Sequence, residues 1–431
     1  MSPLLYLDTI AERLDTYLVL LGLLAPLHFW LARRLAMSIF DPLFIVVLAD
    51  WFGFTLVAFM QVNGDIRGGH FSYYVCSQVA FYGGLLSAHA LFRGPRVRAF
   101  DPPFALVKWV TLFAIAVHVS STVVKWGLTG VPLFNTSRLG VFAESGGLGI
   151  IERFETGAFY ILSFSVLLMW IRFRREIFWT TLLCVLWLLV YIALSGSKAA
   201  LLGLMQVYFL LRYLLAPKRR QSFVGAKGGG KAFVLAAVFS LGVLAVQSQG
   251  NPEEVLLGLA FRLVSFGDIY IYAYIDDTLR YIQGDNPFIG LFGGALSTFR
   301  LMPGDWLYKN MGLQFSAIVF PDLDYLAGPN PRHNVFGFHF FGWAGLIFSF
   351  LIGLVIAYLQ ARLYRREPSG YLSVLWAFLL YFSLVSLSGD FDYSLSTLSS
   401  ILISAVVILV PAQLVCTAGL RPAPSLQNAP R

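Results

Sequence analysis

The segment from Phe336 to Gln360 reads FGFHFFGWAGLIFSFLIGLVIAYLQ. It contains no Asp, Glu, Lys or Arg over 25 residues, and a helix of about 20 apolar residues is long enough to cross the hydrocarbon core of a bilayer. Arg362, Arg365 and Arg366 follow directly. Because Lys and Arg are enriched in cytoplasmic loops, the stretch is predicted to be a membrane-spanning helix whose carboxyl end faces the cytoplasm.

Ten further apolar runs bring the predicted number of spans to eleven. The full set is residues 15–32, 42–62, 71–92, 102–124, 155–171, 177–195, 199–216, 232–248, 336–360, 371–388 and 395–415. Basic clusters follow the odd-numbered spans, as Arg33 and Arg34 follow the first. A single orientation requires this alternation, which places the N-terminus outside and the C-terminus in the cytoplasm.

The composition excludes several classes of protein. Of the 431 residues 58% are hydrophobic and 13% are charged, with a mean hydropathy of +0.73, whereas an ordinary soluble domain carries ~25% charged residues. A cytosolic enzyme and a nucleic-acid-binding module are therefore excluded, so nucleic acid is not expected as a partner. The three cysteines lie in or beside apolar runs, a placement that suits neither a disulfide framework nor a zinc cluster. We predict one all-α polytopic domain over residues 1–431, embedded in membrane lipids.

Two predicted outer loops are long enough to carry function. They are residues 125–154 and 249–335. The second far exceeds the ~15 residues that an ordered loop without secondary structure reaches, so we expect it to contain helices of its own. Glu253–Phe266 and Phe288–Phe299 are apolar enough for this. The prediction is a helical bundle with an extracytoplasmic helical cap.

Basic residues in the outer loops are the first functional signal. Arginine makes bidentate, charge-assisted bonds to phosphate oxygens, so a cavity lined by such residues suits a pyrophosphate. The candidates are Lys125, Arg138, Arg153, Lys198, Arg262, Arg280, Arg300 and Arg332. The alternative for Lys125, Arg153 and Arg280 is a structural role, either at headgroup level or in a pair with a nearby acid. Glu152, Glu155 and Asp277 are the nearby acids for Arg153 and Arg280.

Lys198 belongs to a tight turn, Ser195-Gly196-Ser197-Lys198, between the sixth and seventh spans. Small residues allow a ligand to approach the backbone, and a helix N-terminus adds partial positive charge. An ordinary helix start would also select Ser and Gly, so both interpretations stay open.

The densest cluster of candidates is Gly328-Pro329-Asn330-Pro331-Arg332-His333-Asn334, just before the ninth span. The prolines stiffen this approach, so we expect Arg332 and His333 at the water-facing mouth of a cavity. Arginine can stabilise an anionic leaving group, and neutral histidine can accept a proton. Gly337, Gly342 and Gly345 are expected to allow close helix packing there. The alternative is a plain interfacial cap.

These motifs resemble those of the O-antigen polymerase and ligase superfamily. His333-Asn334-Val335-Phe336 with Gly342-Trp343-Ala344-Gly345 is similar to its "HN-hydrophobic-Phe … Gly-x-x-Gly" signature. Ser195 to Ala200 is similar to its "Ser-Gly-Ser-Arg/Lys-Gly/Ala" turn, and Arg138 with Gly149 matches the R-x10-G motif of Wzy-type polymerases. The second loop departs from that motif, because Arg332 precedes Gly342 by nine intervening residues and Arg300 precedes Gly312 by eleven.

The resemblance implies a GT-C-like fold in the bacterial inner membrane, with a site facing the periplasm. The implied activity is an O-antigen polymerase: a glycosyltransferase that moves a growing glycan from undecaprenyl pyrophosphate onto a new lipid-linked repeat unit. A chain-length regulator and a flippase of the same pathway are expected partners. No metal and no other cofactor is expected, because arginines can neutralise the leaving group. The implied catalytic residues are Arg332, His333 and Glu144, with His333 or Glu144 as the base. The implied substrate-binding residues are Arg138, Gly149, Lys198, Arg262, Arg300 and Asn334.

Several alternatives remain. The nearest is the ligase that transfers O-antigen to lipid A core, and another is a flippase or transporter for lipid-linked sugars. Two DxD triplets, Asp322-Leu323-Asp324 and Asp390-Phe391-Asp392, would suit a divalent cation. The P-loop-like run at residues 225–232 has Ala232 where magnesium needs Ser or Thr. Asp50, the one acid near the middle of a span, is interpreted either as a functional group or as a neutral or arginine-paired structural acid.

Overall fold

The computed structural model describes residues 3–91, 100–134, 149–215, 258, 264–303, 308–321, 328–364 and 370–419. Every regular element in these ranges is a helix, which confirms the all-α prediction for this part of the chain. Several sequence predictions fall outside the described residues. They concern Arg138, Glu144, Arg262, Asp322, Asp324, the span at 232–248 and the run at 225–232.

Seven helical segments among the described residues are long and apolar enough to cross a membrane. They are α2 (Leu14–Leu35), α3 (Pro42–Asn63), α5 (Phe104–Thr129), α7 (Gly149–Arg172), α15 (His333–Phe341) continued by η4 (Gly342–Ala344) and α16 (Gly345–Tyr364), α17 (Tyr371–Leu384) with η5 (Val385–Ser388), and α18 (Phe391–Gly419). Three other predicted spans are also helices, namely α4 (Gly68–Leu91), α8 (Phe178–Leu194) and α9 (Lys198–Leu215). Membrane character is thus supported, and the count of eleven stays a prediction.

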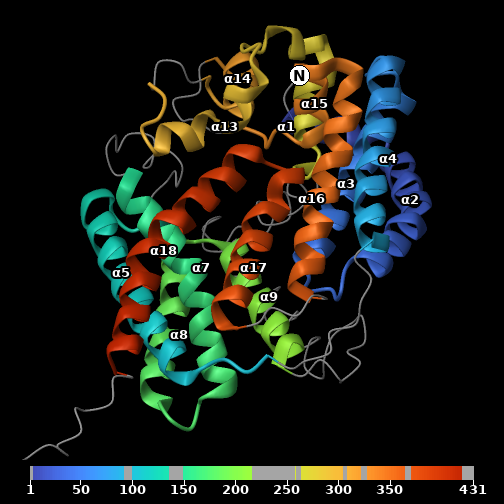
Figure 1. Cartoon of the computed structure of the whole chain (residues 1–431). Coiled ribbons are helices and arrows are strands. Elements are labelled where there is room, and N and C mark those ends of the chain that lie inside the picture. The colour runs from blue at the N-terminus through green and yellow to red at the C-terminus, as the bar shows by residue number, and fades with distance from the viewer. Residues whose placement is uncertain are drawn as a thin grey trace, which may run out of the picture.

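The predicted cap contains helices at one end of the bundle. Its described elements are α12 (Asp268–Tyr274), η2 (Ile275–Tyr281), α13 (Pro287–Thr298) and α14 (Met311–Val319), which gather with α15 and the N-terminal helix α1 (Pro3–Glu12) in the upper part of Figure 1. Asn286 caps α13 and Asn310 caps α14 through their side-chain oxygens. Within the described residues of this segment, short helices with such caps make up much of its length.

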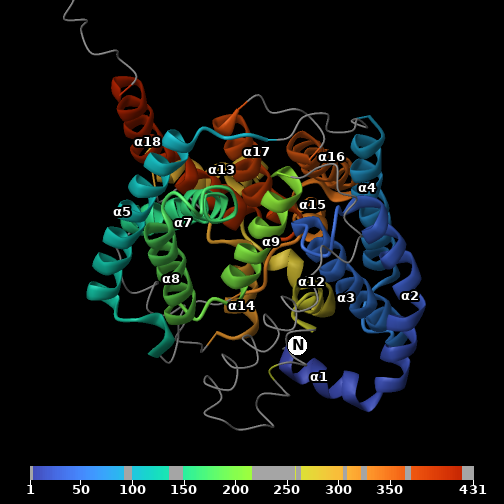
Figure 2. The same cartoon turned by 90° about the horizontal axis from the view of Figure 1, so that it is seen from below.

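The spanning helices form pairs that pack at close range. α4 packs along α16, α7 packs against α5 and α18, and α2 packs along α3 (Figures 1 and 2). A Cβ placed on Gly84 would collide with the backbone oxygen of Phe350, and one on Gly157 with that of Ser400. Small residues therefore set the distance between these helices. The predicted close packing is confirmed for Gly337 and Gly345, because their backbones lie against each other. Gly342 instead has a positive φ (+56°) where α15 ends, a conformation that favours glycine.

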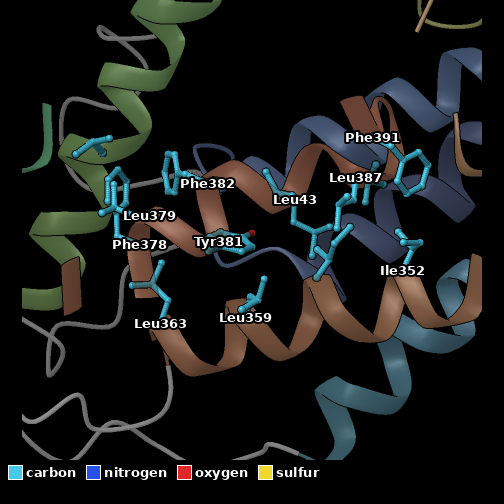
Figure 3. Packing of buried hydrophobic residues seen from close by; sticks show 14 of the residues in the cluster. Leu43, Ile352, Leu359, Leu363, Phe378, Leu379, Tyr381, Phe382, Leu387 and Phe391 are labelled. Carbon is cyan, nitrogen blue, oxygen red and sulfur yellow. The ribbon is translucent and has the colours of Figure 1, made fainter. Parts of the chain in front are cut away.

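A buried apolar cluster joins α3, α16 and α17, with Leu43, Leu359 and Phe378 among its members (Figure 3). Asp41 anchors the edge of this cluster from the turn before α3. Its carboxylate accepts hydrogen bonds from the Met37 and Leu43 amides, at 2.8 and 3.1 Å. It also accepts bonds from the side chains of Gln360 and Tyr381. Burial raises the pKa of Asp41, while these donors satisfy the carboxyl oxygens and hold the turn in place.

Contacts between turns agree with the predicted alternation of ends. Three examples join turns or helix ends expected on the cytoplasmic side, and a fourth example joins segments expected on the outer side. The first three are Gln360 with Leu35, Arg172 with Asp101, and Phe100 with Leu214, and the fourth is Arg67 with Asp277. A consistent alternation brings together turns of the same side. Which side faces the cytoplasm stays a prediction.

Candidate functional site

Arg332 ends the chain segment that leads into α15, and its side chain turns into the bundle. Its Nη1 lies 2.7 Å from Asp50 Oδ1, and its guanidinium lies over the Tyr270 ring, 5.9 Å from the centroid. Tyr82 donates a hydrogen bond to the other Asp50 oxygen at 3.1 Å. Arg332 is only 8% exposed and Asp50 only 3%. The expectation that Arg332 lies at a water-facing mouth is wrong, because a buried carboxylate on α3 compensates its charge inside the bundle; the arginine-paired interpretation of Asp50 is confirmed.

His333 and Asn334 are also enclosed. The His333 ring stacks on Phe81 with centroids 4.6 Å apart, and its Nδ1 lies 2.9 Å from the Ser349 hydroxyl. Its Nε2 is buried and has no hydrogen-bond partner among the described residues. Asn334 exchanges hydrogen bonds with the Tyr270 hydroxyl. The expected position of His333 at the mouth is therefore wrong as well, because the first turn of α15 already packs against α4 and α16.

A cavity of about 460 Å³ lies elsewhere in the bundle. Its walls come from α3, α5, η1 (Pro132–Phe134), α7, α8, α9, α17, η5 and α18. We call it the Lys125 cavity, and its principal polar lining residues are Lys125, Glu152, Glu155, Tyr191, Ser195 and Ser197. Apolar residues of α3 and α9, such as Ile45 and Val207, line another part of the wall. The cavity thus combines charged groups with a surface that suits a lipid chain.

A lysine between two carboxylates forms the charged wall of this cavity. Lys125, near the end of α5, contacts the Glu155 carboxylate and lies 3.6 Å from Glu152 Oε1. The side chains of Lys125 and Glu155 are 8% and 3% exposed, whereas that of Glu152 is 51% exposed. Tyr191 also makes a hydrogen bond with Glu155. Glu152 and Glu155 share one face of α7 because they are three residues apart, so both reach the same ammonium.

The Ser195–Lys198 turn lines the same cavity. It joins α8 to α9 as predicted, with Gly196 in the left-handed region at φ +61°. The Ser197 hydroxyl oxygen accepts a hydrogen bond from the Ala200 amide at 3.4 Å, as at an ordinary helix start. Ser195 and Ser197 both face the cavity. The two interpretations of the turn are thus compatible. The Lys198 side chain lies outside the described part of the structure.

A second cavity, of about 300 Å³, lies between the cap and the first turns of α7 and α18. We call it the Arg153 cavity. Arg153 Nη1 is buried and has no hydrogen-bond partner among the described residues. Asn310 and Asp392 both line this cavity, and Asn310 donates a hydrogen bond to Asp392 Oδ2 at 2.6 Å. The aromatic lining residues are Phe336, Phe340 and Phe391. Cap and bundle enclose this space together.

The other predicted residues are dispersed. Gly149 begins α7, with open space where a Cβ would lie. Arg300 is exposed after α13, lines neither cavity, and adopts φ +55°. Arg280 forms an ion pair with Asp277, as its structural alternative predicts. Of the two acids expected beside Arg153, Glu155 instead pairs with Lys125.

The described residues contain no group of three His, Cys, Asp or Glu side chains able to hold a metal ion. Of the two DxD triplets, the one within the described ranges has other contacts. Asp390 accepts a hydrogen bond from the Tyr393 amide at 2.9 Å, and Asp392 accepts one from Asn310. Metal independence stays a prediction.

The sequence argument missed the role of Glu155 and Tyr191 as cavity residues. It named Glu155 only as a neighbour of an arginine. The available signal was the pair of acids three residues apart at the start of a span, since acids of a spanning helix are expensive unless they face a partner or a water-filled cavity.

Comparison with known proteins finds no matching family model, no similar curated protein and no similar solved structure.

Proposed function

We propose that this chain is a glycosyltransferase of the O-antigen polymerase type, which transfers a growing glycan from undecaprenyl pyrophosphate onto a lipid-linked repeat unit. The observation that carries the proposal is the Lys125 cavity, in which a buried lysine and two carboxylates lie beside the Ser195–Lys198 turn among membrane-spanning helices. We place the reaction in this cavity, on the periplasmic side of the inner membrane. The enclosed position of Arg332 and His333 supports a structural role for both.

Lys125 is the proposed binding group for the pyrophosphate. A cation in a low-dielectric site stabilises negative charge on a leaving group far more strongly than it would in water. The α9 N-terminus adds partial positive charge at the adjoining turn. Ile45 and Val207 provide an apolar surface in the same cavity for the first part of the prenyl chain.

Glu155 is the proposed proton acceptor. A pyrophosphate that binds Lys125 competes with Glu155 for the ammonium, and loss of that cation makes the carboxylate more basic. The acceptor hydroxyl oxygen then forms a bond to the anomeric carbon of the donor sugar. The bond from that carbon to the pyrophosphate oxygen breaks, and its electron pair leaves with polyprenyl pyrophosphate. The hydroxyl proton passes to Glu155. Because Lys125 offsets the negative charge of the leaving group, the proposed step uses no metal.

The test is a reconstitution of the purified chain with a synthetic undecaprenyl-pyrophosphate-linked repeat unit as the only substrate. A ladder of polymer is expected. Lys125→Ala should lower its rate by about 10²–10³, the usual cost of removing one preorganised stabilising group. Lys108→Ala is the matched control, because Lys108 lies on the same helix but beside Trp109 and outside the cavity.

Other outcomes of the same experiment separate the alternatives. Product that forms only when lipid A core is added would identify a ligase. Movement of the intact substrate across a vesicle membrane without new glycosidic bonds would identify a flippase. Either result, or a Lys125→Ala variant that retains the wild-type rate, would contradict the proposal.

A further inference from the structure

A groove of about 360 Å³ lies between α2 and α3, and it shares no lining residue with the two cavities described above. We call it the α2–α3 groove. The residues of each helix that line it are spaced by four and then three positions, so they lie on one face of that helix. The principal ones are Ala25, Phe29 and Ala32 of α2 and Phe44, Leu48 and Trp51 of α3. Because α2 packs along α3, the two faces together form the groove.

The lining of the α2–α3 groove is apolar. Its residues with a ring nitrogen have partners: Trp51 Nε1 donates a hydrogen bond to the Leu21 carbonyl oxygen at 3.0 Å, and His28 Nδ1 lies 3.0 Å from the Leu24 carbonyl oxygen. The His28 side chain is buried, whereas Phe29 is 56% exposed. A ligand would therefore meet mainly hydrocarbon, which favours an apolar chain over a sugar or a free anion.

The groove lies on the outside of the bundle. α2 is at its edge, beside α3 and α4 (Figures 1 and 2), and its large apolar side chains Leu23 and Leu27 are exposed. Such a face in a membrane contacts lipid or another helix. Close helix packing uses small residues at the contact, whereas the rings of Phe29, Phe44 and Trp51 line this groove. Bulky rings keep the backbone of another helix at a distance, while a flexible lipid chain can lie between them.

Two arginines stand at one end of the groove. Ala32 is a lining residue, and Arg33 and Arg34 follow it directly. The Arg33 guanidinium lies over the Phe29 ring, 5.9 Å from the centroid. Both arginines are exposed, and neither forms an ion pair with another described residue. Basic residues at the cytoplasmic ends of membrane helices bind anionic lipid headgroups, and this end of α2 is predicted to face the cytoplasm.

We propose that the α2–α3 groove binds one anionic phospholipid of the phosphatidylglycerol type. One acyl chain lies between the rings of Phe29, Phe44 and Trp51, and the phosphate contacts Arg33 and Arg34. The groove and the cations thus recognise the two parts of the same molecule. This inference does not depend on the proposed function, because lipid binding is measured without any glycan substrate.

The chain offers a matched control pair of cations. Arg174 and Arg175 follow α7, are exposed, and are predicted to lie on the same side of the membrane. The Arg174 guanidinium also lies over aromatic rings, those of Trp170 and Phe178, at 4.6 and 5.2 Å from their centroids. Neither ring lines the α2–α3 groove or either cavity. This pair therefore has the charge of the proposed site without its groove.

Native mass spectrometry of the detergent-purified full chain tests the cationic part of the site. Phosphatidylglycerol and phosphatidylcholine with the same acyl chains are titrated separately, and the fraction of chains that retain a first lipid gives each dissociation constant. The wild-type chain should bind phosphatidylglycerol more tightly. The double variant Arg33→Gln with Arg34→Gln should weaken that binding about thirtyfold, which corresponds to about 1 kcal/mol for each basic residue. Arg174→Gln with Arg175→Gln should bind as the wild type does.

Filling the groove tests its apolar part by the same titration. Ala25→Leu adds three carbon atoms inside the groove and should weaken phosphatidylglycerol binding about fourfold for each methylene group that it displaces. Gly22→Leu is the control, because Gly22 is exposed on the same helix, has open space around a Cβ and does not line the groove. Leu48→Phe fills the groove from α3 if Ala25→Leu lowers the melting temperature without added lipid.

Several results would overturn the proposed lipid site. They are equal affinity of the wild-type chain for the two lipids, an equal loss in the Arg174 and Arg175 control, or unchanged affinity in the folded groove-filling variants. A dimer in the same spectra that disappears in Ala25→Leu would assign the groove to a second copy of the chain. Displacement of phosphatidylglycerol by undecaprenyl phosphate at a lower concentration would assign it to a polyprenyl carrier instead.

Discussion

Two buried ion pairs in this molecule have similar chemistry and different surroundings. Arg332 and Asp50 are enclosed by Tyr82, Tyr270 and neighbouring helices, and neither residue lines either of the two described cavities. Lys125 and Glu155 are buried to a similar degree, yet both face a cavity of about 460 Å³. The first pair can fasten α3 to the start of α15, whereas the second is in a position to exchange its partner for a ligand.

The two pairs show that a dense sequence motif and a cavity lined by charged residues need not coincide. An enclosed pair has no route by which a substrate could replace the carboxylate, and removal of one partner leaves an uncompensated charge. A pair beside a cavity can be solvated or bound by an anion. The distinction depends on the packing around the charges rather than on the residue types.

The largest expected effect comes from breaking the enclosed pair. Arg332→Ala should lower the free energy of unfolding by about 3–5 kcal/mol, because Asp50 then remains buried without a counter-charge. Thermal unfolding of the detergent-purified chain measures this effect. The double variant Asp50→Asn with Arg332→Gln removes both charges and should regain most of the loss.

Lys125→Ala should lower the free energy of unfolding by less than Arg332→Ala does, because the cavity admits water to Glu155. An equal loss for the two variants would contradict the contrast between the two ion pairs.

A smaller effect is expected next to the enclosed pair. Ser349→Ala removes the hydroxyl that lies 2.9 Å from His333 Nδ1. The imidazole then has a second buried nitrogen without a partner, which should cost about 1–3 kcal/mol. Thermal unfolding measures the loss, and the polymerisation rate per folded molecule should stay at the wild-type value. A large drop in rate without a drop in stability would return His333 to the mechanism.

A pH-dependent effect concerns Asp268, which lies in α12 outside the predicted spans. Burial raises the pKa of Asp268 to about 7, and Arg332 acts against this rise. The unfolded carboxyl loses its proton near pH 4, so the folded chain binds more protons between about pH 4 and 7. Stability should therefore fall as the pH rises through this window. Asp268→Asn should flatten the dependence of the melting temperature on pH, and an unchanged slope would contradict the assignment.

Much of the fold could be predicted from the sequence. Apolar runs such as residues 336–360, with their basic flanks, predict helices whatever their tertiary packing. The reason is that a backbone in lipid must satisfy its own hydrogen bonds. The cap could also be predicted, since a long loop with Asn286 and Pro287 before an apolar segment favours helices. The Ser195–Lys198 turn and the pairing of Arg280 with Asp277 followed from local spacing.

The site could be predicted only in part. Asp50 and Arg332 are 282 residues apart in the chain, and no local pattern shows that they meet inside the bundle. Without that contact, prolines beside Arg332 and His333 favoured a position at the surface. Lys125 was identified as a candidate, but its cavity depends on α3, α9 and α18 converging around α7. Cavities are properties of packing among distant segments, and a single sequence specifies them only indirectly.

The most direct test of the central claim compares the two pairs by activity. The measurement is the polymerisation rate per folded molecule, with the synthetic lipid-linked repeat unit, for Glu155→Gln and for the double variant Asp50→Asn with Arg332→Gln. Glu155→Gln should lose about 10²–10⁴ in rate, as expected for loss of a general base, while the double variant should keep a rate of the wild-type order. A Glu155→Gln variant that polymerises at the wild-type rate, together with a folded but inactive double variant, would contradict the account and return the reaction to Arg332.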